Sequence, residues 1–211
     1  MTVLDHAQRS EAWYDARKGL PTCSRFDAIL TPKEGKPSKG QDKLMNELIA
    51  ESLLPPQEGF IRGPMTPEME HGICLEAEAR CAYELEFAKE PVREVGFIIA
   101  EGGLYGGSPD ALVGDNGGVE IKCPNLSTHI GYVRAGILPT EYKCQVHGYM
   151  VVTGRAWWDF FSYTRNVPPF LIRVHRDGFT ESLANALADF CAEYNRVRSS
   201  FNLSPIGQQT A

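Results

Sequence analysis

Residues 108–122 constrain the fold most, because they have the pattern of a β-hairpin that carries charged side chains. Ala111 to Val113 are apolar and strand-forming, and so are Val119 and Ile121. Between them lies the sequence Gly-Asp-Asn-Gly-Gly, whose residues tolerate the positive φ of a tight turn. Since side chains alternate across a strand, Ile121 is expected in a core, with its charged neighbours on the opposite face.

The charged residues of this hairpin predict a metal site. Asp110 precedes the first strand, and closing the hairpin brings its carboxylate beside Glu120, on the same face as Lys122. Carboxylate oxygens are the ligands of hard divalent cations, and Mg²⁺ usually takes one or two of them with water and substrate phosphate. A lysine there can orient or deprotonate a water, or neutralise transition-state charge. The alternative is a surface hairpin with solvated charges; Pro109 and the apolar neighbours of the lysine favour the site.

Charge is distributed unevenly along the chain. The formal net charge of −6 is not typical of a DNA-binding protein. Residues 44–120 hold fifteen acidic and four basic side chains, whereas residues 1–43 and 121–211 are both net basic. The acidic middle therefore contains the predicted metal ligands, and the two basic ends are expected to form walls that contact phosphates.

The length of 211 residues fits a single domain, with a core at about residues 10–200 and a flexible tail at 202–211. No apolar run is long enough to span a membrane, and the N-terminus lacks a signal-peptide pattern, so a cytoplasmic protein is expected. The six cysteines form no C-x-x-C pair. We expect them to be reduced, apolar fillers, and we expect no iron–sulfur or four-cysteine metal site.

Cap and turn signals divide the chain into helices and strands. Helices are expected at residues 11–18, from Ser24 onward, and at 41–53, 67–87, 139–152 and 179–201. Strands are expected at residues 91–100, in the hairpin, and at 157–163 and 170–174. This order predicts an α/β (α+β) fold, in which helices flank the two faces of a mixed central sheet.

Two helical positions allow a functional as well as a structural explanation. Ser24 followed by Asp27 has the spacing of a capping box, and a helix N-terminus there would suit an anion; a simple cap is the alternative. Gly72 in a helix interior costs about 1 kcal/mol relative to alanine. A close helix contact or the approach of a ligand would explain it, and Glu76, one turn later, would project in the same direction.

Several spaced elements of the sequence resemble a nuclease family. Pro109-Asp110 followed by Glu120-Ile121-Lys122 resembles the PD-(D/E)-x-K nuclease core. The further matching elements are Trp13 to Ser24 (WYDARKGLPTCS), Gly72 with Glu76, Ser108-Pro109-Asp110, Glu120 to Pro124, and Gln145 with Gly148-Tyr149. Taken in this order, from about residue 10 to residue 165, they resemble the lambda-type alkaline exonucleases, also called the YqaJ-like viral recombinase family.

The resemblance implies a restriction-endonuclease-like fold and an exonuclease that depends on Mg²⁺, for which Mn²⁺ can substitute. Such an enzyme degrades one strand of linear double-stranded DNA from its 5′-phosphate end to mononucleotides. It leaves a 3′ single-stranded overhang for phage-type homologous recombination. The resemblance also implies a ring-shaped homotrimer and a single-strand-annealing recombinase as partner, in the cytoplasm of a bacterial host.

The same resemblance implies roles for individual residues. Asp110, Glu120 and the backbone carbonyl of Ile121 would be metal ligands, Lys122 would act on the nucleophilic water, and Glu76 would support the metal site. Four residues would bind the terminal 5′-phosphate and the neighbouring backbone: Arg17, Ser24, Ser108 and Gln145. Met69 would be the apolar residue that parts the end base pair. His147 has no role in the resemblance and is expected in the core or in solvent.

Two alternatives remain for the function. One is an endonuclease or junction resolvase on the same fold, which the predicted phosphate-binding set disfavours. The other is a non-catalytic DNA-binding recombination scaffold, which the intact set of Asp110, Glu120 and Lys122 disfavours.

Overall fold

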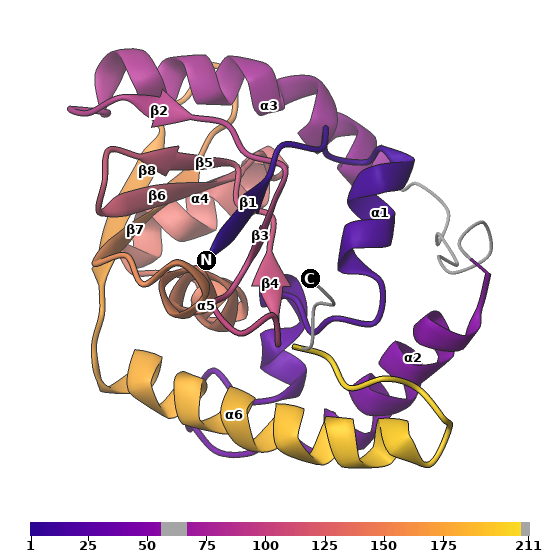
Figure 1. Ribbon diagram of the computed structural model, residues 1–211. Coiled ribbons are helices and arrows are strands. Elements are labelled where there is room, and N and C mark those ends of the chain that lie inside the picture. Colours follow the sequence, from indigo (N-terminus) through magenta and orange to yellow (C-terminus); the bar gives the residue numbers. More distant parts are fainter. Residues whose placement is uncertain (56–66, 208–211) are drawn as a thin grey trace.

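A five-stranded mixed sheet forms the centre of the computed structural model, which describes residues 1–55 and 67–207 but not the side chains of residues 67–71 and 73. Across the sheet lie β2 (Val92–Arg93), β5 (Ala111–Val113), β6 (Gly117–Lys122), β7 (Trp157–Ser162) and β8 (Phe170–His175) (Figure 1). Neighbouring strands are antiparallel except β6 and β7, which are parallel. The predicted hairpin is therefore confirmed as β5 and β6, and so is the mixed central sheet.

The chain between β6 and β7 is a helical crossover, as the parallel pairing of these two strands requires. It contains α4 (Leu126–Ala135), the 3₁₀ turn η2 (Thr140–Tyr142) and α5 (Lys143–Thr153). The two α-helices end at Gly136 (φ 64°) and Gly154 (φ 72°), whose left-handed conformation lets the chain leave each helix. Through this crossover, α5 returns to pack on the sheet next to the hairpin.

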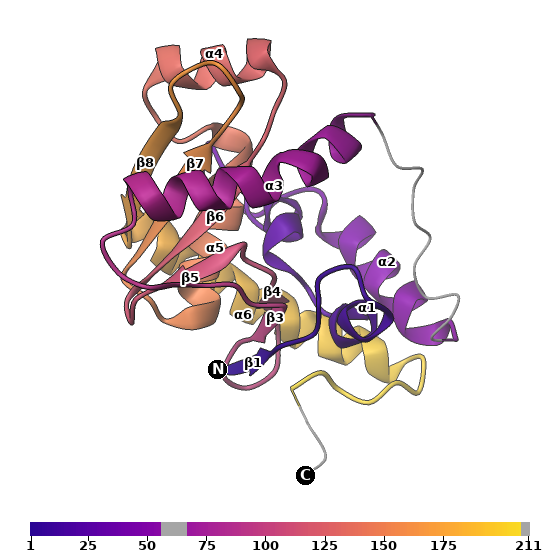
Figure 2. The same cartoon turned by 90° about the horizontal axis from the view of Figure 1, so that it is seen from above.

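Helix α3 (Pro67–Glu86) covers one face of the sheet, as Figures 1 and 2 show. Its buried Ala79 and Tyr83 pack against strand residues that include Val119 and Phe161. By strand alternation, Glu120 and Lys122 lie on the opposite face. Asp110, which directly precedes β5, lies on that same face. The predicted division of the hairpin into a core side and a charged side is confirmed.

The opposite face carries α5, and further helices pack behind α5. These are α6 (Gly178–Ser199), the 3₁₀ helix η1 (Cys23–Ala28) and α2 (Gln41–Leu53). Figure 1 shows α6 along the lower edge of the molecule, with α2 beside it. The predicted burial of Leu44, Met45 and Leu48 on α2 is confirmed. No helix in the two described stretches of chain is both long and apolar enough to cross a bilayer.

A second, smaller sheet was not predicted. It consists of β1 (Thr2–Leu4), β3 (Phe97–Ile99) and β4 (Gly106–Gly107). The single strand expected at residues 91–100 is wrong, because β2 joins the large sheet and β3 joins this one. The division lies near Gly96, where an added Cβ would stand 1.9 Å from the carbonyl oxygen of His6. Gly96 therefore permits the close passage of the N-terminal segment at the point where the chain leaves one sheet for the other.

The residues that follow α6 make contacts with the rest of the protein as far as Ile206. A flexible tail is predicted at residues 202–211; within it, Leu203 and Ile206 pack against the core. Ile206 N–H donates to Asn195 Oδ1 at 2.8 Å, and Arg198 Nε donates to the carbonyl oxygen of Ser204 at 2.8 Å. Residues 203–207 are therefore held on α6.

The six cysteines and His147 were expected mainly in the core, and this prediction is confirmed in part. All six thiols are free; Cys23, Cys144 and Cys191 are buried, but Cys74 and Cys81 are exposed, so these two are not fillers. His147 lies in the core rather than in solvent, 2 % exposed, with Nδ1 2.8 Å from Thr180 Oγ1. Burial lowers its pKa to about 4.

Candidate active site

A cleft of about 1140 Å³ opens where β6 ends, bordered by α1 (Glu11–Arg17), α3, α4 and α5. Apart from Met69, every residue that the sequence predicts for the site lines this cleft, although these residues are spread over more than 120 positions of the sequence. They are Arg17, Ser24, Glu76, Ser108, Asp110, Glu120, Ile121, Lys122 and Gln145. The fold thus assembles the predicted set in one place.

The two hairpin carboxylates meet as the turn predicted. Asp110 Oδ2 accepts a hydrogen bond from the backbone N–H of Ile121 at 2.5 Å, which places it next to the residue that follows Glu120. Glu120 is only 2 % exposed. Burial, and then the charge of Glu120, raise the pKa of Asp110 well above its usual value. A second negative charge is therefore unfavourable here unless a cation is present.

Lys122 is the cation that the protein itself supplies. Its Nζ donates to Glu120 Oε1 at 2.5 Å, and it lies 5.1 Å from the centre of the Tyr142 ring. Burial alone would lower the pKa of Lys122, but the charges of Glu120 and Asp110 raise it above its usual value. In this arrangement the lysine is a charged hydrogen-bond donor beside the acid pair.

One oxygen of the acid pair has no donor. Glu120 Oε2 is buried, and no described group hydrogen-bonds to it. A buried anionic oxygen without a partner is costly, so its position suits a bound cation. Ile121 adds a backbone carbonyl, which strand geometry directs to the same edge as its N–H, toward Asp110.

These ligands fit a magnesium-type site. Among the residues that the structure describes, no three His, Cys, Asp or Glu side chains are grouped as a metal cage. Mg²⁺ does not need such a cage, because it commonly binds through one or two carboxylates and keeps water and substrate phosphate as its other ligands. Asp110, Glu120 and the Ile121 carbonyl match that requirement.

Helix α5 orients Glu120 from the side. Gln145 Nε2 donates to Glu120 Oε1 at 2.7 Å and to Tyr149 Oη at 2.9 Å. Tyr149 Oη in turn donates to the carbonyl oxygen of Ser108 at 3.1 Å, and its ring stacks on Trp158 with the centroids 4.9 Å apart. Both amide hydrogens of Gln145 are thus engaged, which fixes one oxygen of Glu120 and leaves the other for a cation.

Arg17 presents a second positive centre in the cleft. Ser108 Oγ accepts hydrogen bonds from Arg17 Nη1 at 2.8 Å and from Trp13 Nε1 at 2.9 Å. The guanidinium lies 4.0 Å from the centre of the Trp13 ring, and burial lowers the pKa of Arg17. No described carboxylate lies within ion-pair distance of it. A half-buried guanidinium with spare donors is suited to a phosphate.

Ser24 lines the cleft but does not cap a helix. The capping box expected with Asp27 is wrong, because the helix is the short 3₁₀ helix η1, whose N-cap is Thr22 and makes no side-chain cap bond. Ser24 is exposed in its first turn, with Oγ 3.4 Å from Thr22 Oγ1. Its hydroxyl makes no helix-capping hydrogen bond and can therefore bind a ligand in the cleft.

Helix α3 contributes Glu76 to the cleft. Glu76 Oε2 lies 2.9 Å from Arg9 Nη2. One turn earlier, a Cβ added to Gly72 would meet no described atom within 4 Å. A close helix contact therefore does not explain this glycine, whereas the approach of a ligand stays a prediction. Met69, the predicted apolar wedge, is outside the described side chains.

Three polar residues that hold the site together were not predicted from the sequence: Gln8, Arg9 and Arg155. Arg155 Nη1 donates to three carbonyl oxygens around the hairpin turn, those of Val113 (3.3 Å), Gly114 (2.8 Å) and Gly117 (2.6 Å). Partners about 40 positions away leave no local pattern, and the only signal was a basic residue just after the glycine that ends a helix.

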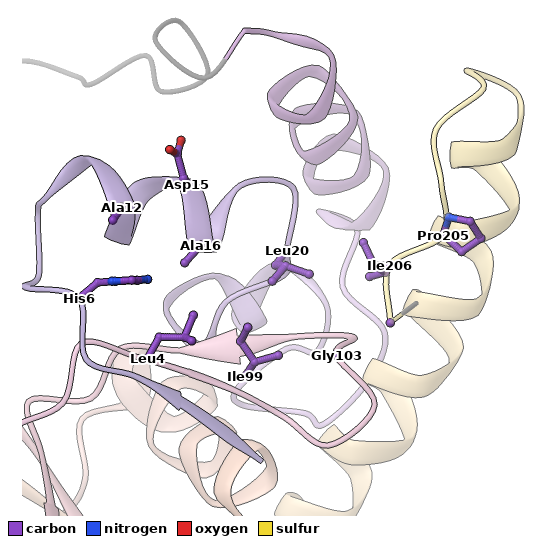
Figure 3. Close-up of a pocket in the computed structure, with 11 residues that line it drawn as sticks. Leu4, His6, Ala12, Asp15, Ala16, Leu20, Ile99, Gly103, Pro205 and Ile206 are labelled. Carbon is purple, nitrogen blue, oxygen red and sulfur yellow. The ribbon is translucent and has the colours of Figure 1, made fainter. Parts of the chain in front are cut away.

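A second cavity, of about 550 Å³, lies under α1 on the side of the small sheet (Figure 3). Most of its lining is apolar, including Leu4, Leu20, Ile99 and Ile206; His6 extends alongside α1, whereas Asp15 points away. It contains neither of the paired carboxylates. The chemistry described above therefore belongs to the cleft, not to this cavity.

Residues 12–156 match the model of the YqaJ-like viral recombinase domain, which is more than half of the chain. The chain belongs to the YqaJ-like viral recombinase family. It is also similar to the crystal structure of an alkaline exonuclease (LHK-Exo) from Laribacter hongkongensis, with 34 % identity and a TM-score of 0.78. That match covers 92 % of this chain and 96 % of the other.

Two further structures extend the comparison of this YqaJ-family chain. LHK-Exo in complex with dAMP matches with 34 % identity and a TM-score of 0.71, over 92 % of this chain and 98 % of that one. A phage-related exonuclease from Haemophilus somnus 129PT shares the fold, with 16 % identity, a TM-score of 0.53 and coverage of 86 % and 96 %. None of the curated proteins matches the chain in sequence. The protein is thus an alkaline exonuclease-like nuclease with the mixed sheet of that fold.

Proposed function

We propose that this protein is a 5′-to-3′ exonuclease that degrades one strand of linear double-stranded DNA to mononucleotides. It leaves a 3′ overhang for phage-type homologous recombination. The observation that carries the proposal is one cleft that combines an acid pair, half-buried Asp110 and buried Glu120, with Lys122 and the half-buried guanidinium of Arg17. The first set suits phosphodiester hydrolysis, and the second suits a terminal phosphate.

Asp110, Glu120 and the carbonyl of Ile121 would hold Mg²⁺, or Mn²⁺ in its place. The bound ion would lower the pKa of a water and stabilise charge on the reacting phosphate. Lys122, already aimed at the acid pair, donates to the negative charge that develops on the phosphate oxygens. Glu76, on the opposite wall, supports the site or its water.

Polarity follows from a phosphate pocket next to the acid pair. Arg17, Ser108 and Ser24 would bind the 5′-phosphate, since an arginine forms charge-assisted hydrogen bonds with phosphate and the two hydroxyls lie in the same cleft. Gln145 can join them only by releasing Tyr149 or Glu120, so before DNA binds its role is to orient Glu120. A pocket that requires a free end makes cleavage exonucleolytic.

The proposed partners rest on the family resemblance. They are double-stranded DNA with 5′-phosphate ends, two further copies of the chain in a ring-shaped homotrimer, and a single-strand-annealing recombinase that receives the overhang.

The test is digestion of linear duplexes with 5′-phosphate or 5′-hydroxyl ends, with and without Mg²⁺, each strand labelled separately. We expect mononucleotides from the 5′-phosphate strand only, in the presence of metal, with the complementary strand intact. A closed circular duplex is the matched control and should survive. Cleavage of the circle would instead establish an endonuclease, and the absence of any nucleotide release would leave a DNA-binding scaffold.

A further inference from the structure

One positive side chain of the cleft, that of Arg9, has no part in the function proposed above. Arg9 lies in a turn before α1, closed by a hydrogen bond from Ser10 N–H to the carbonyl oxygen of Ala7 at 3.0 Å. Its φ is 71°, a left-handed conformation that side-chain-bearing residues rarely adopt. Such a conformation persists only where the surrounding structure enforces it, and these positions gather at binding and catalytic sites.

The turn is fixed to the catalytic hairpin by the residue before Arg9. Gln8 Nε2 donates to the carbonyl oxygen of Val95 at 3.2 Å and to that of Pro109 at 3.1 Å. Pro109 immediately precedes Asp110, so the turn is held one residue from the acid pair. The close passage of His6 over Gly96 holds the same segment from its other side. The backbone of Arg9 is thus placed with reference to the site.

The side chain of Arg9 pairs with Glu76, but this pair is weak. Arg9 Nη2 lies 2.9 Å from Glu76 Oε2, and the two side chains are 46 % and 26 % exposed. An ion pair this open to water contributes little to stability. The guanidinium is therefore available to a stronger partner that arrives in the cleft.

A DNA strand that reaches the acid pair enters the same cleft and carries a phosphate at every nucleotide. Both Arg9 and Glu76 line that cleft, on the wall opposite α5. A DNA phosphate is a better partner for this guanidinium than the exposed carboxylate of Glu76, because binding to DNA also releases the counterions of the phosphate backbone.

We propose that Arg9 is a further DNA-binding residue, which exchanges Glu76 for a backbone phosphate of the strand in the cleft. This inference rests on the proposed function, because it takes DNA as the substrate. In the free protein Glu76 holds the guanidinium toward the cleft. When DNA binds, Glu76 loses its ion pair with Arg9, and its free carboxylate lies near Asp110 and Glu120.

The experiment measures the binding of a short 5′-phosphorylated duplex in EDTA, so that cleavage does not enter, over a series of salt concentrations. Arg9→Gln removes the charge, Arg9→Gly removes the side chain but suits the positive φ, and Arg9→Lys keeps the charge. We expect the first two to weaken binding about five- to tenfold and to lower the salt slope by about one ion, and Arg9→Lys to restore part of both.

Arg165→Gln is the matched control, because Arg165 also pairs with a glutamate of α3, Glu78, but does not line the cleft. It should bind DNA like the wild type. Thermal unfolding of each variant confirms that it is folded. In turnover assays Arg9→Gln should raise KM more than it lowers kcat.

Two results would overturn the inference. One is unchanged affinity and salt slope in both Arg9→Gln and Arg9→Gly. The other is a fall in kcat with KM and salt slope unchanged, which would make Arg9 only a positioning residue for Glu76. Failure of the proposed function is distinct, since it would appear as wild-type protein that binds duplex DNA in EDTA but releases no nucleotides with Mg²⁺.

Discussion

Replacing Arg155 by alanine should loosen the hairpin on which the acid pair depends. Arg155 follows the glycine that ends α5, and its Nη1 donates to the carbonyl oxygens of Val113, Gly114 and Gly117. These carbonyls flank the turn between β5 and β6, so this single side chain ties α5 to both strands. Alanine leaves all three carbonyl oxygens without that donor.

The size of the effect follows from the geometry. Hydrogen bonds to a charged group contribute about 1.5–3 kcal/mol each, and two of the three bonds here are short. Because they share one nitrogen and the side chain is partly exposed, we take about 3 kcal/mol in total. At about 2.1 cal/mol/K of unfolding entropy per residue, a chain of this length should lose roughly 7 °C in Tm.

The assay is thermal and urea unfolding of Arg155→Ala beside Arg155→Lys, with nucleotide release measured well below both values of Tm. Lysine keeps a charged donor for one carbonyl, so its Tm should fall by about half as much. Activity should fall in the same order, because the turn positions Glu120. An alanine variant that unfolds within about 2 °C of the wild type would refute this account of the hairpin.

Three other substitutions are informative. Lys122→Ala should lower nucleotide release by at least about 100-fold while duplex binding persists, because Nζ serves the acid pair; near-normal turnover would contradict its role. The fold lowers the pKa of His147 to about 4, so the folded protein favours the neutral imidazole. The free energy of unfolding should therefore be unaffected by this residue above about pH 6.5 and should fall by about 3 kcal/mol as the pH drops to about 4. In His147→Gln, urea unfolding should show a free energy of unfolding that depends less on pH over that range. The same pH dependence as in the wild type would refute this role of His147. Gly72→Ala should raise Tm by about 2 °C, as a helix interior predicts, yet weaken duplex binding. Unchanged affinity would mean that no ligand approaches this glycine.

The parts of the site that the sequence predicted are those encoded by short-range patterns. Strand alternation and a glycine-rich turn are local, so they place Asp110, Glu120 and Lys122 correctly with no knowledge of the remaining chain. The approach of α3 and α1 to the hairpin is not local. There the resemblance of spaced motifs, rather than propensity, predicted that Glu76 and Arg17 belong to one cleft.

The errors have long-range or one-residue causes. Residues 91–100 all favour a strand, but the choice of partner divides them between two sheets, and one partner is the N-terminal β1. Thr22 and Ser24 are both good caps, and their spacing to the helix alone does not choose between them. The contacts of Gln8 and Arg155 span 38 to 101 positions, so no local pattern indicates them.

The parallel pairing of β6 with β7 has a consequence for how the protein is made. Glu120 leaves the ribosome 25 residues ahead of Gln145, which orients it, and β7, which borders β6 on its second side, follows later still. A nascent or prematurely terminated chain therefore holds its acid pair on an unsupported ribbon. The acid pair therefore gains both of its supports only after Ser162 has been added, when about three-quarters of the printed sequence has been translated.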